Sequence, residues 1–281
     1  MTQITSRRSV TSEQPRNPTG RFTSETGRQC GSLTSISKAS AARRNGLRGG
    51  RPRKVGPAHQ YVVRERLARL EPREPLANLD GSTVERIDTA TARLLILRYE
   101  WLGTLGRPRA CYGLYSREGD LIGAVTFGNP AGNGARQLCG PEWRDQVIAL
   151  ERGACVHWAP RNAATFLLRR AVRLAHRDFG WSIFLAYADP SAGEIGTIYQ
   201  ASNWFYIGTG RQGRARDRFM RPDGRVVDER MLRHGGLRLA DVVGWRRVSA
   251  PAKHRYVWFE GAEAATLRQA CRARTRAYPK R

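Results

Sequence analysis

In the central part of the chain, apolar residues recur with the spacing of helices, about 3.6 residues, in some segments and with the spacing of strands, about 2 residues, in others. Both patterns together are typical of an α/β protein. Residues 83–98 place Ile87, Ala90, Leu94, Ile96 and Leu97 mainly on one face of a helix, and residues 163–179 predict a longer amphipathic helix. Residues 111–116 and 121–128 flank a short polar turn, which indicates a β-hairpin.

Three further apolar segments complete a predicted sheet. Strands are expected at 147–158, 181–189 and 204–208, with a short helix at 193–202. The order of hairpin, strand, helix, strand, helix and strand favours an α/β fold in which helices pack on one sheet.

The ends of the chain differ in composition from its centre. Residues 1–58 are rich in Ser, Thr, Gly and Arg and lack apolar periodicity, which predicts a disordered basic arm. Residues 59–260 are expected to form one folded domain with a basic insertion at 211–250, read as a hairpin or loop. Residues 261–281 are expected to form a basic tail.

The charge of the chain points to a polyanionic partner. The 281 residues include 49 Lys plus Arg and 24 Asp plus Glu, a net charge of +25. Residues 1–60 carry +10 and residues 211–281 carry +12, whereas residues 61–210 carry only +3. Such a field attracts nucleic acid, and double-stranded DNA is the expected partner.

Two arginine-rich segments are candidate DNA contacts. The first, RGGRPRK at 48–54, resembles an AT-hook, whose arginines enter a narrow A·T-rich minor groove. A basic linker that contacts only phosphates is the alternative, and both readings imply affinity for nucleic acid. The second segment, within 211–255, is expected to contact phosphates. The candidate DNA-binding residues are Arg48, Arg51, Arg53, Lys54, Arg211 and Arg214.

Composition argues against several classes of protein. No run approaches the ~20 apolar residues of a membrane span, and the first residues lack the apolar core of a signal peptide. We therefore expect a soluble, cytoplasmic protein without membrane contact. The 5 Cys are odd in number without a CxxC pair, and the 5 His lack metal-ligand spacing, so reduced thiols and no metal are predicted. The oligomeric state stays open.

The order of strand, basic turn, long helix and strand resembles the pyrophosphate loop of acyl-coenzyme A transferases of the GNAT superfamily. In those enzymes, backbone amides at a helix N-terminus bind the phosphates. The turn Arg161-Asn162-Ala163-Ala164-Thr165 is similar to their Gln/Arg-x-x-Gly/Ala loop. The resemblance implies that these residues hold acetyl-CoA or a related acyl-CoA, with the Thr165 hydroxyl also on a phosphate. An ordinary helix start is the alternative.

A set of motifs between about residues 84 and 210 resembles one family as a whole. The most specific block runs from Tyr187-Ala188-Asp189-Pro190 to Gly196-Thr197-Ile198-Tyr199-Gln200-Ala201. Further matches are Leu150-Glu151-Arg152, the turn before the long helix, Trp204 and the later Lys253-His254-Arg255-Tyr256-Val257. The family is the Mom family of bacteriophage DNA-modification proteins. The resemblance implies a GNAT-like domain, with a mixed and mostly antiparallel sheet, that converts adenine in DNA to a carbamoylmethylated form and so protects phage DNA from restriction.

Four residues are candidates for catalysis. Asp189 ends an apolar strand, where burying a carboxylate is costly unless it has a hydrogen-bonding partner or a functional role. By analogy with the family it orients the substrate or removes a proton from the adenine amine. A helix cap is the alternative. Tyr199 would protonate a leaving thiolate, or simply belong to the core. Arg152, a lone charge in a strand, is expected to pair near Glu151, with Asp189 or with ligand. Glu100 stands where many relatives carry His and would replace it as a base, with a non-catalytic role equally plausible.

These observations lead to one main hypothesis and two alternatives. The main hypothesis is a phage enzyme that modifies adenine in duplex DNA with an acyl-CoA type donor. The alternatives are a GNAT acetyltransferase acting on a protein or RNA, and a non-enzymatic DNA-binding protein built on a GNAT-like core.

Overall fold

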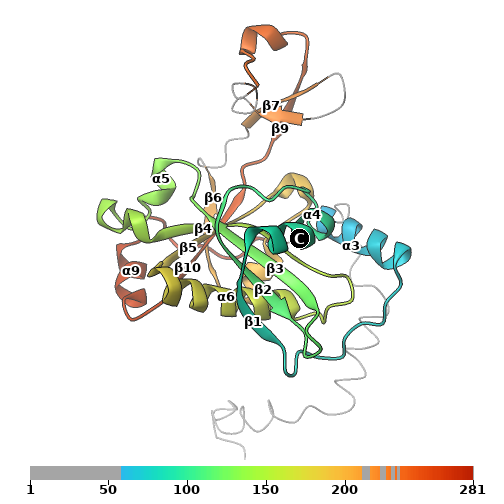
Figure 1. Ribbon diagram of the computed structural model, residues 1–281. Helices are drawn as coiled ribbons and strands as arrows, with labels where there is room; N and C mark the ends of the chain where they lie inside the picture. Colours follow the sequence, from blue (N-terminus) through green and yellow to red (C-terminus); the bar gives the residue numbers. More distant parts are fainter. Residues whose placement is uncertain (1–57, 211–215, 222–225, 229–231, 233–234, 281) are drawn as a thin grey trace, which may run out of the picture. The chain divides into compact units, whose positions relative to one another are not determined.

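Seven strands form the main sheet of the protein (Figure 1). The computed structural model describes residues 58–280 except 211–215, 222–225, 229–231 and 233–234. In spatial order the strands are β1 (Thr83–Ile87), β2 (Pro108–Tyr115), β3 (Leu121–Gly128), β4 (Val147–Cys155), β5 (Ile183–Ala188), β10 (His254–Phe259) and β6 (Phe205–Thr209). Neighbours are antiparallel except β4 with β5, which are parallel. The predicted α/β fold with a mixed, mostly antiparallel sheet is confirmed.

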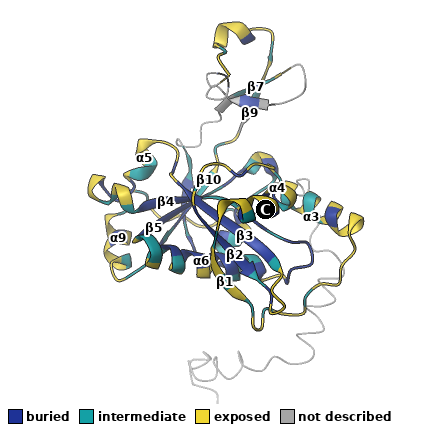
Figure 2. Ribbon diagram, viewed as in Figure 1, coloured by how far each residue is buried: buried dark blue, intermediate teal, exposed yellow. Residues whose placement is uncertain are grey.

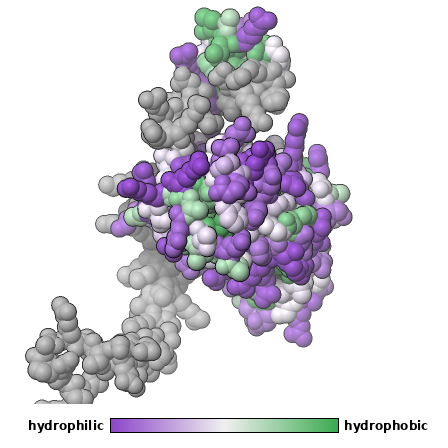
Figure 3. Space-filling view, turned by 90° about the vertical axis from the view of Figure 1, so that its left-hand side faces the viewer, coloured by the Kyte–Doolittle hydropathy of each residue, from purple (hydrophilic) through white to green (hydrophobic). Residues whose placement is uncertain are grey.

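Helices connect these strands and cover the sheet. They are α3 (His59–Leu70), α4 (Thr89–Tyr99), α5 (Asn133–Arg136), α6 (Ala163–Phe179), α7 (Thr197–Ala201) and α9 (Ala264–Ala270), with 3-10 turns η1 (Pro141–Gln146), η2 (Pro190–Ala192) and η4 (Leu239–Val242). Helix α4 packs on β2 to β4, and α6 packs on β1 to β4. Figure 2 shows the central strands buried and the outer sides of the helices exposed. Hydrophilic side chains cover most of the face in Figure 3, so the apolar residues are largely used in the core.

The long amphipathic helix forms as predicted. Its buried residues recur every three or four positions: Ala163, Leu167, Leu168, Ala171, Val172 and Ala175. The helix ends at Gly180, which adopts a left-handed φ of 69° and donates its N–H to the His176 carbonyl. The basic turn leads into this helix, and together they connect the end of β4 to the start of β5.

The prediction of a single helix over 83–98 is wrong in its first part. Residues Thr83–Ile87 form β1, which pairs along its whole length with β2. Asp88 then caps α4, because its side chain accepts a hydrogen bond from the Thr91 N–H at 2.7 Å. The buried face of α4 also differs from the predicted one: Leu94 is 78% exposed, whereas Leu95 is buried.

The basic insertion contains a small second sheet. Strand β7 (Arg216–Met220) pairs with β8 (Val226–Asp228) as a hairpin and with β9 (Arg246–Ala250) on its other side. These strands enclose a core of their own, made of Phe219, Val227, Leu232 and Val242. Of the two alternatives expected for this region, a hairpin or a loop, the paired strands β7 and β8 correspond to the hairpin, and β9 adds a third strand.

The residues after β10 pack against the main sheet. Leu267 of α9 is fully buried beside Val257 and Phe259. The Arg276 N–H donates to the Tyr206 carbonyl at 2.8 Å, and the Tyr278 hydroxyl donates to the Trp204 carbonyl at 2.9 Å. The region read as a basic tail is thus tied to the fold. None of the described helices is long and apolar enough to cross a membrane.

Candidate functional site

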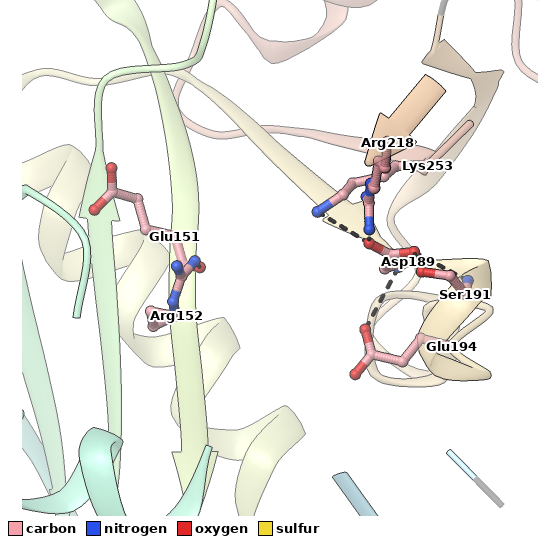
Figure 4. A network of polar contacts seen from close by, with 7 residues as sticks. All are labelled: Glu151, Arg152, Asp189, Ser191, Glu194, Arg218 and Lys253. Carbon is pink, nitrogen blue, oxygen red and sulfur yellow. Dashed lines mark hydrogen bonds and ion pairs between the residues drawn. The ribbon is translucent and has the colours of Figure 1, made fainter. Parts of the chain in front are cut away.

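Strands β4 and β5 are joined along only part of their length. Their parallel ladder runs from Val147 with Ile183 to Ala149 with Leu185. Strand β4 then continues beside β3, and β5 continues beside β10. The two strands therefore separate toward their C-terminal ends, and Figure 4 shows Arg152 on β4 apart from Asp189 after β5. Residues that follow these two strands frame the candidate site.

Asp189 is the centre of a polar group (Figure 4). Its carboxyl Oδ1 accepts from the Ser191 hydroxyl at 2.5 Å and from the Ser191 N–H at 3.0 Å, which also caps η2. Oδ2 lies 3.3 Å from Lys253 Nζ and 3.5 Å from the Arg218 guanidinium. Burial raises the pKa of this carboxyl, but the Ser191 hydrogen bonds and the two cations outweigh burial, so the pKa lies below its ordinary value. Asp189 is therefore an ionised carboxylate held in one orientation.

Glu194 and Glu100 add two further carboxyl groups. Glu194 accepts a hydrogen bond from the Asp189 N–H at 3.5 Å, and the polar Trp101 side chain lowers the pKa of its carboxyl in part. Glu100, at the end of α4, is buried and accepts from the Leu102 N–H at 2.8 Å. Burial raises the pKa of both side chains, and the charge of Glu194 raises the pKa of Glu100 further. Both are therefore stronger proton acceptors than Asp189.

Tyr199 lies in α7 within a cluster of aromatic rings. Its ring centroid is 5.5 Å from that of Trp204 and 5.2 Å from that of Tyr256. Burial raises the pKa of its hydroxyl, and the charges of Glu194 and Glu100 raise it further, so the phenol is protonated at neutral pH. Among the described residues the hydroxyl has no hydrogen-bond partner. The ring is thus part of the core, while the hydroxyl can serve as a proton donor.

Strand β4 has a bulge beside the site. Its pairing with β3 joins Thr126 with Arg152 but Phe127 with Leu150, so Glu151 is the extra residue. A bulge turns neighbouring side chains out of the regular alternation, and Figure 4 shows Glu151 pointing away from the Asp189 group.

Arg152 binds the loop that follows α4. Its guanidinium donates to the Thr104 carbonyl and hydroxyl, each at 2.8 Å, and to the Glu151 carbonyl at 2.6 Å. It is only half-buried and forms no ion pair with Asp189 in the described structure. Its positive charge lowers the pKa of Glu100, against the larger effect of burial. Arg152 therefore fixes the loop next to Glu100.

The turn before α6 leaves donors available for an anion. Arg161 and Asn162 are exposed, and Asn162 makes no side-chain cap on the helix. The amides of Ala164 and Thr165 lie in the first turn, where intrahelical partners are lacking. The Thr165 hydroxyl already donates to the Asn162 carbonyl at 2.8 Å, so the backbone amides are the better donors.

Other predicted contacts cannot be placed in the structure. The candidate DNA-binding residues lie outside the described part of the chain: Arg48, Arg51, Arg53, Lys54, Arg211 and Arg214. Within the described part, no three His, Cys, Asp or Glu side chains are grouped so as to hold a metal ion.

Three members of the polar group were not singled out from the sequence. Glu194 is the only acidic residue between Asp189 and Tyr199, which is the signal that would have found it. Lys253 begins a motif that was noted without a role. Arg218 lies in an arginine run whose members the sequence does not distinguish.

Comparison with known families identifies the group to which this site belongs. The model of the Mom protein family matches residues 82–280, which include the polar group around Asp189, Glu100, Arg152, Tyr199 and the turn before α6. The chain belongs to the Mom protein family. A comparison with curated proteins finds no match.

Solved structures similar to this Mom-family protein are acetyltransferases. An IAA acetyltransferase from Bacillus cereus has 15% identity and a TM-score of 0.36, with 64% of this chain and 99% of that chain covered. An acetyltransferase from Bacillus subtilis in complex with CoA has 12% identity and a TM-score of 0.38, with 64% and 99% covered. A GCN5-related N-acetyltransferase from Kribbella flavida has 12% identity and a TM-score of 0.37, with 65% and 100% covered.

Proposed function

We propose that this Mom-family protein modifies the exocyclic amine of adenine in duplex DNA to carbamoylmethyl-adenine. The grouping of Asp189, Glu194, Glu100 and Tyr199 beyond the point where β4 and β5 separate is the observation that carries the proposal. Membership of the Mom protein family supports the choice of reaction, because the resemblance described under the sequence analysis implies adenine modification. The net charge of +25 supports DNA as the substrate.

Glu194 is proposed as the proton acceptor. Modification replaces one N–H bond of the amine by an N–C bond, so one proton must leave the nitrogen. Burial raises the pKa of Glu194 toward the range in which a carboxylate accepts a proton efficiently. Asp189, held ionised by Lys253 and Arg218, is suited to orienting the amine.

Tyr199 is proposed as the proton donor to the leaving group. Its pKa is raised by burial and by neighbouring carboxylates, so the hydroxyl keeps its proton at neutral pH and can donate a hydrogen bond to the negative charge that develops on the leaving group. Its hydroxyl is free of other described partners, and the packing of its ring against Trp204 and Tyr256 fixes its position.

An acyl-CoA is the proposed cofactor. The exposed Arg161 and the amides of Ala164 and Thr165 fit the diphosphate of such a molecule, since a helix N-terminus and a guanidinium both favour phosphate. When bound, the molecule would supply an activated acyl group, whose transfer to the amine would form an N–C bond, break the C–S bond and release CoA as a thiol. That transfer alone gives an N-acyl-adenine, so the carbamoylmethyl product would also require a donor of its amide nitrogen and a two-electron oxidant. Glu100, whose pKa is raised by burial and by the charge of Glu194, is proposed as a second base, and Arg152 positions the loop next to it.

The biological setting is proposed from the same family resemblance. Modified adenine would shield phage DNA from restriction in the host cytoplasm. The arm residues Arg48, Arg51, Arg53 and Lys54 would contact the DNA, as would Arg211 and Arg214.

Nucleoside analysis tests the proposal directly. DNA from cells that express the protein is digested, and its nucleosides are examined by mass spectrometry for adenine carrying an added carbamoylmethyl group. We expect that group in cells with the unaltered protein and its loss with Glu194→Gln or Tyr199→Phe, which retain side-chain shape. An unmodified adenine pool in the presence of folded protein would refute the proposal.

A matched control separates chemistry from charge. Glu263→Gln makes the same change as Glu194→Gln at an exposed position ahead of α9. It is expected to leave the amount of modified adenine unchanged.

A further inference from the structure

The exposed face of α6 consists entirely of arginine. Every residue of this helix that is exposed is an Arg, and we call the four together the arginine ridge: Arg169, Arg170, Arg173 and Arg177. Three of them recur every fourth residue, which places them in one row along the helix. The opposite face of the helix packs on β1 to β4, so the ridge faces away from the sheet.

Most of the ridge lacks neutralising partners. Arg177 pairs with Asp178 at 2.8 Å, and Arg170 lies over the Phe166 ring at 4.3 Å. In the described structure no carboxylate lies within ion-pair distance of Arg169, Arg170 or Arg173. Three cations are thus presented side by side at the surface.

Two more arginines extend this surface at the end of α6. Arg86 lies over the Phe179 ring at 4.7 Å, and Arg109 lies over the Trp181 ring at 5.1 Å. The two rings stack on each other with centroids 4.3 Å apart. The rings hold both guanidinium groups near the C-terminal end of the ridge.

This concentration is unexpected from the charge of the segment that contains it. Residues 61–210 carry a net charge of only +3, which by itself indicates a nearly neutral surface. Helix α3 shows the ordinary pattern, in which Arg69 pairs with Glu65 four residues before it. In α6, by contrast, the exposed arginines are not interspersed with acidic residues, so positive charge is concentrated on this one helix.

We propose that the arginine ridge binds the phosphate backbone of duplex DNA, as a contact distinct from the candidate catalytic site. Arg169 and Arg177 are eight residues apart, or about 12 Å along a helix. That length spans roughly three to four phosphate steps of one DNA strand, at about 3.4 Å each along the duplex axis. Arginine suits this partner, because its planar fork binds phosphate oxygens in pairs.

The salt dependence of DNA binding tests the proposal. The full chain is titrated onto a fluorescently labelled duplex at several salt concentrations, and binding is followed by anisotropy. The variant is Arg169→Gln/Arg170→Gln/Arg173→Gln. The control is Arg66→Gln/Arg93→Gln/Arg272→Gln, which changes three exposed arginines on other parts of the surface and gives the same net charge.

The ridge variant is expected to reduce the slope of log affinity against log salt by about 2.7, since each phosphate contact contributes about 0.9. The control is expected to change it by less than about 1. Equal slopes for the two variants would overturn the proposal, as would an unchanged slope in the ridge variant. Loss of binding to polyglutamate with unchanged DNA binding would assign the ridge to an acidic protein and overturn it too.

This experiment is independent of the proposed chemistry and shares with it only the premise that DNA is the substrate. Binding is measured without a donor, so an absence of modified adenine would leave the result intact. Circular dichroism melts of both variants check that each is folded.

Discussion

Replacing Gly196 by Ala should destabilise the fold through the aromatic cluster that holds Tyr199. Gly196 precedes α7 with a φ of 74°, a left-handed conformation that costs a residue with a Cβ about 1–2 kcal/mol. An added Cβ would also lie 2.7 Å from Tyr256 Cζ and 3.0 Å from Tyr199 Cδ2. The distance to Tyr256 is too short for two carbon atoms and the distance to Tyr199 is tight, so the buried rings must shift.

The expected cost follows from three effects. The backbone conformation costs about 1–2 kcal/mol, and overpacking against two rings costs about 1–3 kcal/mol. The lower conformational entropy of the unfolded chain with Ala in place of Gly offsets about 0.4–1 kcal/mol of this cost. The net loss is about 1–5 kcal/mol in the free energy of unfolding, or roughly 2–20 °C in melting temperature for a domain of this size.

Two other glycines separate these effects. Gly103 has a φ of 59° and no atom within 4 Å of a built Cβ, so Gly103→Ala tests the backbone effect alone and should cost at most about 1.5 kcal/mol. Gly134 has neither feature, so Gly134→Ala should be neutral or stabilise by up to about 1 kcal/mol.

The assay is denaturant unfolding followed by circular dichroism, with thermal melts as a check. The free energy of unfolding should fall from Gly134→Ala to Gly103→Ala and further to Gly196→Ala. If Gly196→Ala costs no more than Gly103→Ala, the rings do not restrict this position and the reasoning fails.

Three other substitutions test separate parts of the structure. Folding raises the pKa of Glu194, so the folded state favours the protonated carboxyl. The free energy of unfolding therefore falls as pH rises from about 4.5 through the raised pKa, because the buried side chain must ionise. Glu194→Gln should therefore gain stability relative to the unaltered protein between pH 4 and pH 7 in urea titrations; a constant difference would contradict this. Tyr112→Phe removes a buried hydroxyl that donates to Asp178 at 3.0 Å, and should lower the free energy of unfolding by about 1 kcal/mol. An unchanged urea midpoint would count against that bond. Leu267→Ala opens a cavity at a fully buried position and should cost about 2–5 kcal/mol in thermal and urea unfolding. A loss well below this would mean that α9 is not part of the cooperative unit.

Elements with strong local patterns could be predicted from the sequence. Helix α6 and the β2–β3 hairpin are encoded in consecutive residues, and both form near the predicted bounds. Residues 83–87 could not be assigned correctly, because their apolar spacing continues into α4 and only pairing with β2 makes them a strand. Strand β10 was not predicted, since its two neighbours lie far away in the sequence.

The candidate site was predictable in part for the same reason. Asp189 and Tyr199 stand in a specific motif, and both lie in the polar and aromatic groups described above. The raised pKa of Glu194 depends on burial by distant parts of the chain, which no local pattern records. Hydrogen bonds to Thr104, a residue 48 positions earlier, orient the Arg152 side chain, and no local sequence pattern indicates such a distant partner.

The position of β10 between β5 and β6 has a consequence for how the chain is made. Strands β1 to β4 are consecutive neighbours, so each can pair soon after it leaves the ribosome. Strand β5 can pair with the start of β4, but it must wait about 70 residues for β10, its partner on the other side, or roughly 4–14 s at bacterial rates of synthesis. During that interval an apolar strand edge is open to other chains. The yield of folded protein should therefore depend on how fast the last strand arrives.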